Sequence, residues 1–350
     1  MSSLRLKRPL GRTFLLASMF FVLAVGLAEL AARLAPVQAL LPAPSLGSGH
    51  QNFDLKLARL DAFVRKEGGV DCIFLGPSTV NYGLDPEVVR SAYRARTGRD
   101  LRCFNFGLAA LNNAVMSDLV DILVDRYHPG FMVLGTFPGQ ERFGRNTANR
   151  LLANPWFATR LGRRSFRGWL LDHSLAYRYF LRFCVWLEHP NFSRLLSNIE
   201  ARTRPDGFTR SLKTMPGIEK PPGRRTEREF YRRFANFRMG RGQLAGLERV
   251  LKAKSRVGLA VLEMPIHRTA LAFFGGGPED YTRVVEAIRV RAGRAGVPFW
   301  TPEGLGLPAN CWKDRHHLNA AGARVLSLWL EPKIEESFKD AGSAGPGGRT

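Results

Sequence analysis

Val70-Asp-Cys-Ile-Phe-Leu-Gly-Pro-Ser78 is a short apolar run that stops at a Gly-Pro pair followed by a serine. A run of this length bounded by turn residues predicts a buried β-strand. A helix is expected over about 85–97, with Pro86 in its first turn. A second apolar run, Leu101–Phe106, then ends at Gly107. The alternation of strand and helix predicts βαβ units and therefore a parallel sheet.

The same alternation continues on both sides of a long middle region. Short apolar runs predict strands at Phe131–Thr136, Val257–Met264 and Val297–Trp300, and apolar periodicity predicts helices over about 112–127, 279–295 and 320–337. The predicted fold class is therefore α/β, as a three-layer α/β/α sandwich of flavodoxin-like type with a mainly parallel sheet.

An apolar segment near the N-terminus predicts a transmembrane helix over 13–35, after a basic, cytoplasmic stretch 1–12. Residues 13–34 would span about 33 Å as a helix, which is enough to cross a bilayer. The basic flank places the N-terminal side in the cytoplasm and the rest of the chain outside. A cleaved signal peptide is the competing interpretation, with Gly26-Leu27-Ala28 as its cleavage site. The helical pattern continues to Pro36 and favours an uncleaved anchor, and both interpretations export the domain.

The composition of the remaining chain divides it into a linker, a folded domain with an insertion, and a tail. Pro and Gly predict a linker over 36–52, and the folded domain is expected over 53–338. Within that domain, 138–255 lacks clear strand alternation and is rich in aromatic and basic residues, so it is interpreted as an insertion that caps or flanks the sheet. A helix is expected there over 166–188 and a loop over 202–228. The Gly- and Ser-containing end, 339–350, is expected to be disordered.

The 350 residues carry a net charge of +22, with 52 Lys and Arg against 30 Asp and Glu. This charge has two possible origins. One is an arginine-biased genome, and the other is a role in binding a polyanion such as an acidic polysaccharide or anionic lipid. Nucleic acid is disfavoured, because no zinc-ligand spacing or RNA-binding motif is present and the domain is expected outside the cytoplasm. The four cysteines form no CxxC pair, so no metal site is predicted. Cys72 and Cys103 are expected to be buried in strands.

Ser78, Asp314 and His317 are the residues that predict chemistry. Reacting groups in open parallel sheets lie beyond the carboxyl ends of the strands, where Ser78 is expected. A serine hydroxyl needs a base within hydrogen-bond reach, which His317 can supply. Asp314 lies three residues earlier and can hold the imidazole and offset its charge. His316 is the competing base, and it is expected to face solvent or substrate.

Two sequence blocks carry a resemblance to a known family. Gly76-Pro-Ser78 follows the first predicted strand, and Asp314-Arg-His-His317-Leu-Asn-Ala-Ala-Gly322 precedes the last predicted helix. In content and order the blocks resemble those of SGNH (GDSL-type) hydrolases, which implies the Ser78, Asp314 and His317 triad. The resemblance also implies an oxyanion hole made by the amides of Ser78 and Gly107. Asn105 and Asn112 flank Gly107 and are candidate additional donors.

The chain departs from the family pattern at two places. Pro77 stands where the usual motif has Asp, and the third block lacks its usual Asn. Thr136 and Gln140 are candidates to replace the hydrogen bond of that Asn. The N-terminal anchor and Asp85-Pro86 make the chain similar to a membrane-anchored branch of the family, whose members take part in teichoic-acid D-alanylation and in O-acetylation of alginate and other exopolysaccharides.

This resemblance implies a membrane-tethered serine esterase or O-acyltransferase outside the cytoplasmic membrane, in the periplasm or at the cell exterior. Its expected substrate is an acyl ester on an anionic glycan, and its expected partner is a membrane-bound O-acyltransferase. No cofactor and no metal are expected. Two alternatives remain open from the sequence: an inactive SGNH-like scaffold of a surface-polymer assembly complex, and a general lipase-like esterase.

Overall fold

The computed structural model describes residues 10–138, 145–220, 241–274 and 276–343. Its centre is a five-stranded sheet in the order β2-β1-β3-β4-β5, and every pair of neighbouring strands is parallel. The strands are β1 (Cys72–Gly76), β2 (Cys103–Gly107), β3 (Phe131–Thr136), β4 (Gly258–Glu263) and β5 (Phe299–Trp300). The predicted α/β class with a mainly parallel sheet is confirmed.

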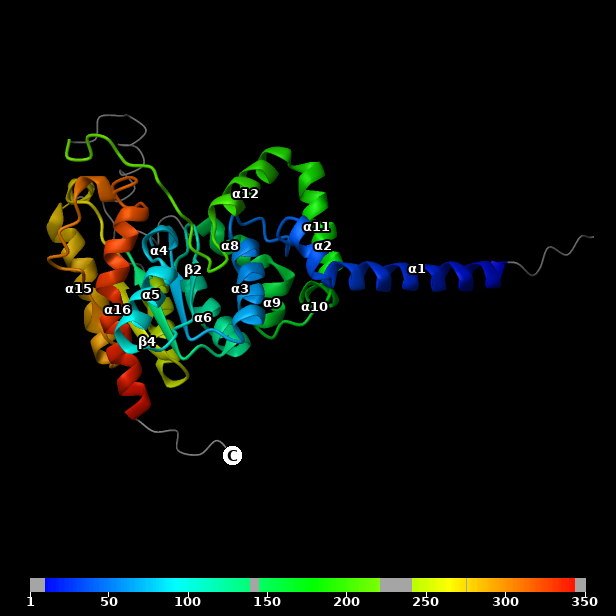
Figure 1. Ribbon diagram of the computed structural model, residues 1–350, viewed down its shortest axis with the longest axis horizontal. Coiled ribbons are helices and arrows are strands. Elements are labelled where there is room, and N and C mark those ends of the chain that lie inside the picture. Colours follow the sequence, from blue (N-terminus) through cyan, green and yellow to red (C-terminus); the bar gives the residue numbers. More distant parts are fainter. Residues whose placement is uncertain (1–9, 139–144, 221–240, 275, 344–350) are drawn as a thin grey trace, which may run out of the picture.

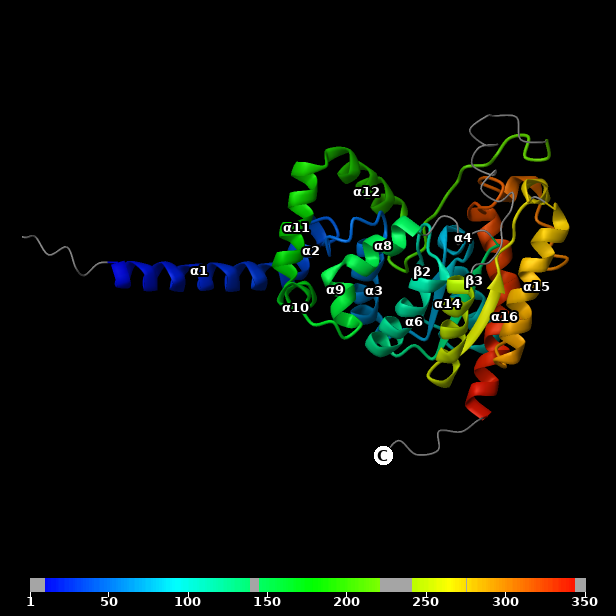
Figure 2. The ribbon, with the colours of Figure 1, turned by 180° about the vertical axis from the view of Figure 1, so that it is seen from behind.

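Helices cover both faces of the sheet (Figures 1 and 2). Because successive strand residues point to opposite faces, Ile73 and Leu75 pack into one hydrophobic core and Phe74 packs into the other. The first core is closed by α3 (Phe53–Glu67), α6 (Asn113–Tyr127), α14 (Arg241–Lys252) and α15 (Pro278–Arg294). The second core is closed by α4 (Ser78–Gly83), α5 (Pro86–Thr97) and α16 (Ala320–Ser343).

Side-chain caps fix where the helices around the site begin. The Asp85 carboxylate accepts hydrogen bonds from the amides of Glu87 and Val88 at the start of α5. Asn112 caps α6 in the same way through the amide of Val115, at 3.1 Å. Such caps satisfy amides that have no partner inside the helix. The Asp85-Pro86 pair therefore has a local structural role: Asp85 caps the start of α5, and Pro86 is its first residue.

The middle region consists mainly of helices between β3 and α14. They are α8 (Arg145–Ala153), α9 (Pro155–Arg160), α10 (Phe166–His173), α11 (Leu175–Glu188) and α12 (Pro190–Arg202). The single helix expected over 166–188 is broken at Ser174, whose hydroxyl caps α11 by accepting from the amide of Tyr177. The expected insertion to about 255 also reaches too far. Helix α14 packs beside α6 against the sheet and so belongs to the β3–β4 crossover (Figure 2).

The N-terminal helix α1 (Leu10–Arg33) projects away from the domain (Figure 1). Within it, Gly11–Arg33 is long and apolar enough to span a membrane, and none of the most apolar stretch is buried against the protein. The following stretch, predicted as a linker, contains a short helix, α2 (Ala35–Leu40), and then packs on the domain. Leu46 and His50 are buried, and Ser45 donates to Asp54 of α3 at 2.7 Å, so this stretch is ordered rather than a free spacer.

The helix α16 runs to Ser343, which is further than the expected end near 337. The tail expected to be disordered over 339–350 is therefore helical as far as Ser343, and its remainder, 344–350, lies outside the described residues.

The close approach of α4 to the end of β2 generates a stability prediction. A Cβ atom at Gly107 would lie 2.3 Å from the backbone nitrogen of Asn81, so Gly107→Ala has to push two backbone segments apart. We expect a loss of about 1–3 kcal/mol in the free energy of unfolding, measured by chemical denaturation of the full chain in detergent.

Gly293→Ala in α15 is the matched control, since a Cβ atom there meets nothing within 4 Å. Alanine is the better helix former, so this variant should match or exceed the wild type by up to about 1 kcal/mol. Equal stability of Gly107→Ala and wild type would contradict the close packing of α4 on β2.

Candidate active site

Ser78 is the first residue of α4, directly beyond the end of β1. Gly76 allows α4 and β3 to pack close to the end of β1, because a Cβ atom there would clash with the Val80 side chain and lie 2.6 Å from the carbonyl oxygen of Gly135. Val80 and Asn81 donate their amides to the carbonyl oxygen of Pro77, which closes the first turn. The half-buried Ser78 hydroxyl is thus held at the carboxyl edge of the sheet, as the sequence predicts.

Asp314 and His317 lie in a closed loop that precedes α16. Trp312 and Leu318 form an antiparallel bridge across the loop, and the Lys313 amide donates to the carbonyl oxygen of His317 at 2.9 Å. Inside the loop, Asp314 Oδ1 accepts the His317 amide at 2.9 Å. Contacts within the loop therefore fix the carboxylate and the imidazole relative to each other, without help from other elements.

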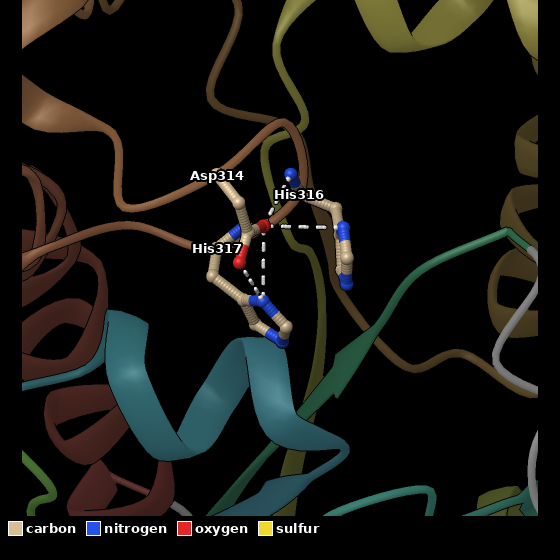
Figure 3. A group of neighbouring side chains, drawn as sticks. All are labelled: Asp314, His316 and His317. Carbon is tan, nitrogen blue, oxygen red and sulfur yellow. Dashed lines mark hydrogen bonds and ion pairs between the residues drawn. The ribbon is translucent and has the colours of Figure 1, made fainter. Parts of the chain in front are cut away.

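The three predicted residues meet in one chain of hydrogen bonds. Ser78 Oγ lies 2.8 Å from His317 Nε2. The other ring nitrogen, His317 Nδ1, lies 2.8 Å from Asp314 Oδ2 and 3.0 Å from Oδ1 (Figure 3). Tyr82 of α4 packs edge-on against the same imidazole, with ring centroids 5.3 Å apart. A serine, a base and a carboxylate in this order have the geometry that activates a hydroxyl as a nucleophile.

Asp314 is held in its ionised form. Burial opposes ionisation, but the charges of His317 and His316, the hydrogen bond from the His317 ring and the hydrogen bond from the His316 backbone amide dominate and lower the pKa of the carboxyl below its usual range. At neutral pH the carboxylate is therefore charged and can stabilise a positive charge on His317.

His316 occupies a different position from His317. Its ring stacks on Phe137 with centroids 5.9 Å apart, and its Nδ1 lies 3.2 Å from Asp314 Oδ1 (Figure 3). Burial, followed by the neighbouring His317 imidazole, lowers the pKa of His316 from 6.5 to about 3. His316 is therefore neutral at pH 7, and it is His317 that lies within hydrogen-bond distance of Ser78.

A cavity of about 350 Å³ opens beside Ser78 and His317. The helix α12 contributes one wall through Leu195, Ile199 and Arg202, so the middle region completes the cavity. Lys313 lines it from the other side, and its ammonium lies 3.5 Å from the centre of the Tyr82 ring. Among the described residues that line the cavity there are two cationic side chains and no carboxylate. The remaining lining residues are Gln51, Asn52, Pro77, Asn81, Ala109, Ala110, Phe137 and His316.

The expected oxyanion role of Gly107 does not fit the hydrogen bonds that its amide makes. The Gly107 N–H donates to Asn105 Oδ1 at 2.9 Å, inside the core. The Asn105 amide group in turn donates to the carbonyl oxygens of Val80 and Leu84, and Oδ1 also accepts from Lys56. Asn105 is completely buried, so these groups hold α4 against β2 and are not directed at a substrate.

Two of the three remaining candidates also have structural contacts. Asn112 caps α6, and the carbonyl oxygen of Thr136 at the end of β3 accepts the Met264 amide at 2.8 Å. Neither residue lines the cavity. Gln140 lies outside the described residues.

Ala110 is a cavity residue that sequence reasoning missed. Its φ of 53° lies in the left-handed region, which non-glycine residues seldom adopt, and backbone strain of this kind clusters at functional sites. Ala110 and Ser78 both line the cavity, and neither amide has an acceptor among the described residues. Asn52 holds the preceding turn by accepting from the Ala109 amide and donating to the Gly107 carbonyl oxygen. An alanine in this conformation leaves no signal in a single sequence.

Asp314, His316 and His317 also offer three ligand atoms within 4.8 Å of one another, which is a spacing that can hold a metal ion. In this arrangement, however, both ring nitrogens of His317 already lie in hydrogen bonds, one with Ser78 and one with Asp314. A metal bound through His317 would have to displace one of these two partners.

No model of a known protein family matches this chain, and no curated protein matches its sequence. Solved structures with a similar arrangement include a Clostridium thermocellum family 3 carbohydrate esterase, with 12% identity over 78% of this chain and 99% of that chain and a TM-score of 0.35. An inhibitor-bound M. smegmatis aryl esterase has 13% identity over 76% and 99% of the two chains, with a TM-score of 0.33.

A gut microbial diltiazem-metabolizing enzyme has 13% identity over 77% of this chain and 47% of that chain, with a TM-score of 0.37. At these identities and TM-scores, the likeness does not assign chemistry to this chain, and only its own side chains can.

The low pKa of His316 generates a prediction about pH and stability. In the unfolded chain this imidazole takes up a proton near pH 6.5, whereas in the folded chain it does so only near pH 3. Between these values the unfolded state binds more protons, so the free energy of unfolding falls as the pH falls from about 6.5 toward 3. His316→Gln removes this contribution, and its loss of stability between pH 7 and pH 4.5 should be smaller than that of the wild type.

Chemical denaturation of the full chain in detergent at several pH values measures this difference. His189→Gln, at an exposed histidine, is the control and should lose stability with pH as the wild type does. An identical pH dependence for His316→Gln and wild type would show that His316 has the same pKa in the folded and the unfolded chain, and would contradict the prediction.

Proposed function

We propose that this chain is a membrane-tethered serine esterase or O-acyltransferase of SGNH type that acts on acyl esters of an anionic glycan. The observation that carries the proposal is the continuous chain of hydrogen bonds from Ser78 through His317 to Asp314 at the mouth of a cavity. The two sequence blocks that resemble SGNH hydrolases supply these residues in the family's order.

In the first half of the reaction, Ser78 Oγ attacks the carbonyl carbon of the ester while His317 Nε2 takes the hydroxyl proton. The imidazolium that forms is stabilised by the Asp314 carboxylate at Nδ1. The tetrahedral intermediate then collapses, the bond between the acyl carbon and the leaving oxygen breaks, and His317 returns the proton to the leaving alcohol, which is the sugar hydroxyl in the esterase case. The acyl group remains on Ser78 as an ester.

The oxyanion of this intermediate needs N–H donors that are not already engaged. The amides of Ser78 and Ala110 meet that condition and replace the Ser78 and Gly107 pair suggested by the family resemblance. The left-handed conformation at Ala110 is then the backbone strain that presents its amide to the cavity.

In the second half, His317 takes a proton from an acceptor hydroxyl, whose oxygen attacks the acyl-Ser78 carbonyl. The second tetrahedral intermediate collapses, the bond to Ser78 Oγ breaks, and His317 returns the proton to Oγ. Water as acceptor makes the chain an esterase, and a sugar hydroxyl makes it an acyltransferase. The same residues serve both outcomes, because only the identity of the acceptor differs.

The preference for an anionic substrate is supported by the charges around the cavity. Arg202 from α12 and Lys313 from the loop before α16 line it on different sides, with no carboxylate among the described lining residues. A cation in a partly desolvated cleft attracts carboxylate or phosphate groups and raises their local concentration. This fits a polymer such as an acidic polysaccharide better than a neutral lipid ester.

The proposed location follows from α1. Its apolar length and the basic residues before it favour an anchored chain whose domain lies outside the cytoplasmic membrane, facing the periplasm or the cell exterior. A membrane-bound O-acyltransferase is the partner expected to supply acyl groups in the transferase case.

Ser78→Ala tests the nucleophile. Hydrolysis of an aryl acetate by the full chain in detergent should fall by at least about 10³-fold in kcat/KM, because the remaining groups cannot form the acyl-enzyme. Ser91→Ala, at an exposed serine of α5, is the matched control and should retain wild-type activity.

EDTA should leave the wild-type rate unchanged, since no step of the mechanism uses a metal. Activity that survives Ser78→Ala but is lost in EDTA would instead assign Asp314, His316 and His317 to a metal centre. A wild-type chain without esterase or transferase activity would favour the scaffold alternative.

Lys313→Ala and Arg202→Ala test the substrate class. Each should raise KM for an acetylated anionic glycan several-fold while changing kcat/KM for a neutral aryl acetate little, and the difference should shrink at high salt. Arg289→Ala, at an exposed arginine of α15, controls for the loss of one positive charge. Equal effects on charged and neutral esters would contradict electrostatic recognition at the cavity.

A further inference from the structure

The helices α10 and α11 present an aromatic face to solvent. We define this aromatic face as Phe166, Trp169, Phe180, Phe183, Trp186 and Leu187, each of which is more than half exposed. Among the described residues outside α1, every Phe and Trp with a largely exposed side chain belongs to it. Exposed apolar side chains gathered on one surface mark a contact with another apolar phase or a partner.

The aromatic side chains of this face form ordered stacks. Phe166 stacks on Trp169, and Phe183 stacks on Trp186, with ring centroids 6.1 and 5.8 Å apart. On α11, the buried Arg178 and Arg182 lie on the side turned toward the domain. Phe180, Phe183 and Leu187 follow a spacing of three and four residues, so they share the opposite side of the helix.

The aromatic face is fixed relative to α1 by polar contacts at the α10–α11 junction. The Glu29 carboxylate of α1 accepts hydrogen bonds from the Leu175 and Ala176 amides and from the Ser174 hydroxyl, at 2.8–3.1 Å. It therefore caps α11 from another helix. Arg33 pairs with Glu29 and donates to the carbonyl oxygen of His173 at 2.8 Å. The end of α1 is thus part of the folded domain and not a loose tether.

Figures 1 and 2 show α10 and α11 at the end of the domain from which α1 projects, with α11 running crosswise to α1 in both views. If α1 crosses a bilayer, a helix placed crosswise at its outer end lies along the membrane surface. Its outward side, opposite Arg178 and Arg182, then faces the lipid.

We propose that the aromatic face lies in the headgroup region of the same membrane that α1 spans. This inference rests on the proposed anchoring of the chain by α1. Trp and Phe are favoured at the boundary between water and hydrocarbon, and interfacial helices combine such residues with Arg. Arg163, Arg164 and Arg167 are exposed around Phe166 and Trp169, which suits a leaflet that contains anionic lipid.

This contact holds the active site at a set height above the bilayer. The helix α12 follows α11 directly and contributes Leu195, Ile199 and Arg202 to the cavity wall. Two consecutive helices therefore connect these features. The helix α11 carries part of the aromatic face and is capped by Glu29, and α12 forms the cavity wall. A glycan emerging at the membrane surface would meet the cavity in one orientation.

Quenching of tryptophan fluorescence by brominated lipid tests this proposal on the full chain. The protein is reconstituted into nanodiscs of phosphatidylcholine and phosphatidylglycerol with brominated or ordinary acyl chains. The described part of α1 contains no Trp, so quenching reports on the domain. We expect clear quenching in the wild type and the loss of most of it in the Trp169→Phe, Trp186→Phe double variant.

A Trp300→Phe, Trp329→Phe double variant is the matched control and should retain the quenched component, because these residues lie on β5 and α16 and pack against the second hydrophobic core. Full incorporation of the chain without quenching, or quenching that is unchanged in the Trp169 and Trp186 variant, would overturn the lipid contact. In the first case, a dimer found by light scattering would assign the aromatic face to a second copy of the chain.

The two proposals fail in distinguishable ways. A chain that does not enter nanodiscs overturns the anchoring and the lipid contact together. Aryl acetate hydrolysis measured on the same samples tests the Ser78 chemistry separately, and it should be unchanged in both double variants.

Discussion

The hydrogen bond between Ser78 Oγ and His317 Nε2 joins residues that are 239 positions apart, and the proposed chemistry depends on it. Ser78 is positioned as the first residue of α4, which packs closely on the end of β1 because Gly76 has no side chain to clash with Val80. His317 is positioned by the loop in which Asp314 accepts its amide and faces its ring. Each half is locally determined, and the parallel sheet brings the halves together at one edge.

The middle region connects this site to the N-terminal helix. Glu29 of α1 caps α11, and α12 continues from α11 to form a wall of the cavity. The middle region therefore has two structural roles. Its helix α12 completes the cavity, and its helix α11 binds the end of α1. Arg202 of this region lines the cavity, whereas the exposed aromatic face is carried by α10 and α11.

The sequence was sufficient for features that depend on local patterns. Apolar runs between turn residues placed all five strands, and the blocks around Ser78 and His317 placed the three residues that meet. It failed where tertiary contacts decide. Gly107 ends a strand as expected, but its amide is taken by Asn105, whose own contacts involve Lys56 and two carbonyl oxygens. The left-handed backbone of Ala110 and the break at Ser174 depend on packing that no single-sequence pattern contains.

The central claim is that His317 activates Ser78 as a nucleophile. Reaction of the full chain with a serine-directed fluorophosphonate, followed by peptide mass spectrometry, tests it most directly. We predict a single phosphonylated peptide that carries the adduct on Ser78, and loss of labelling in His317→Ala with retention in His316→Gln. Labelling of another serine, or labelling of Ser78 that is unchanged in His317→Ala, would contradict the claim.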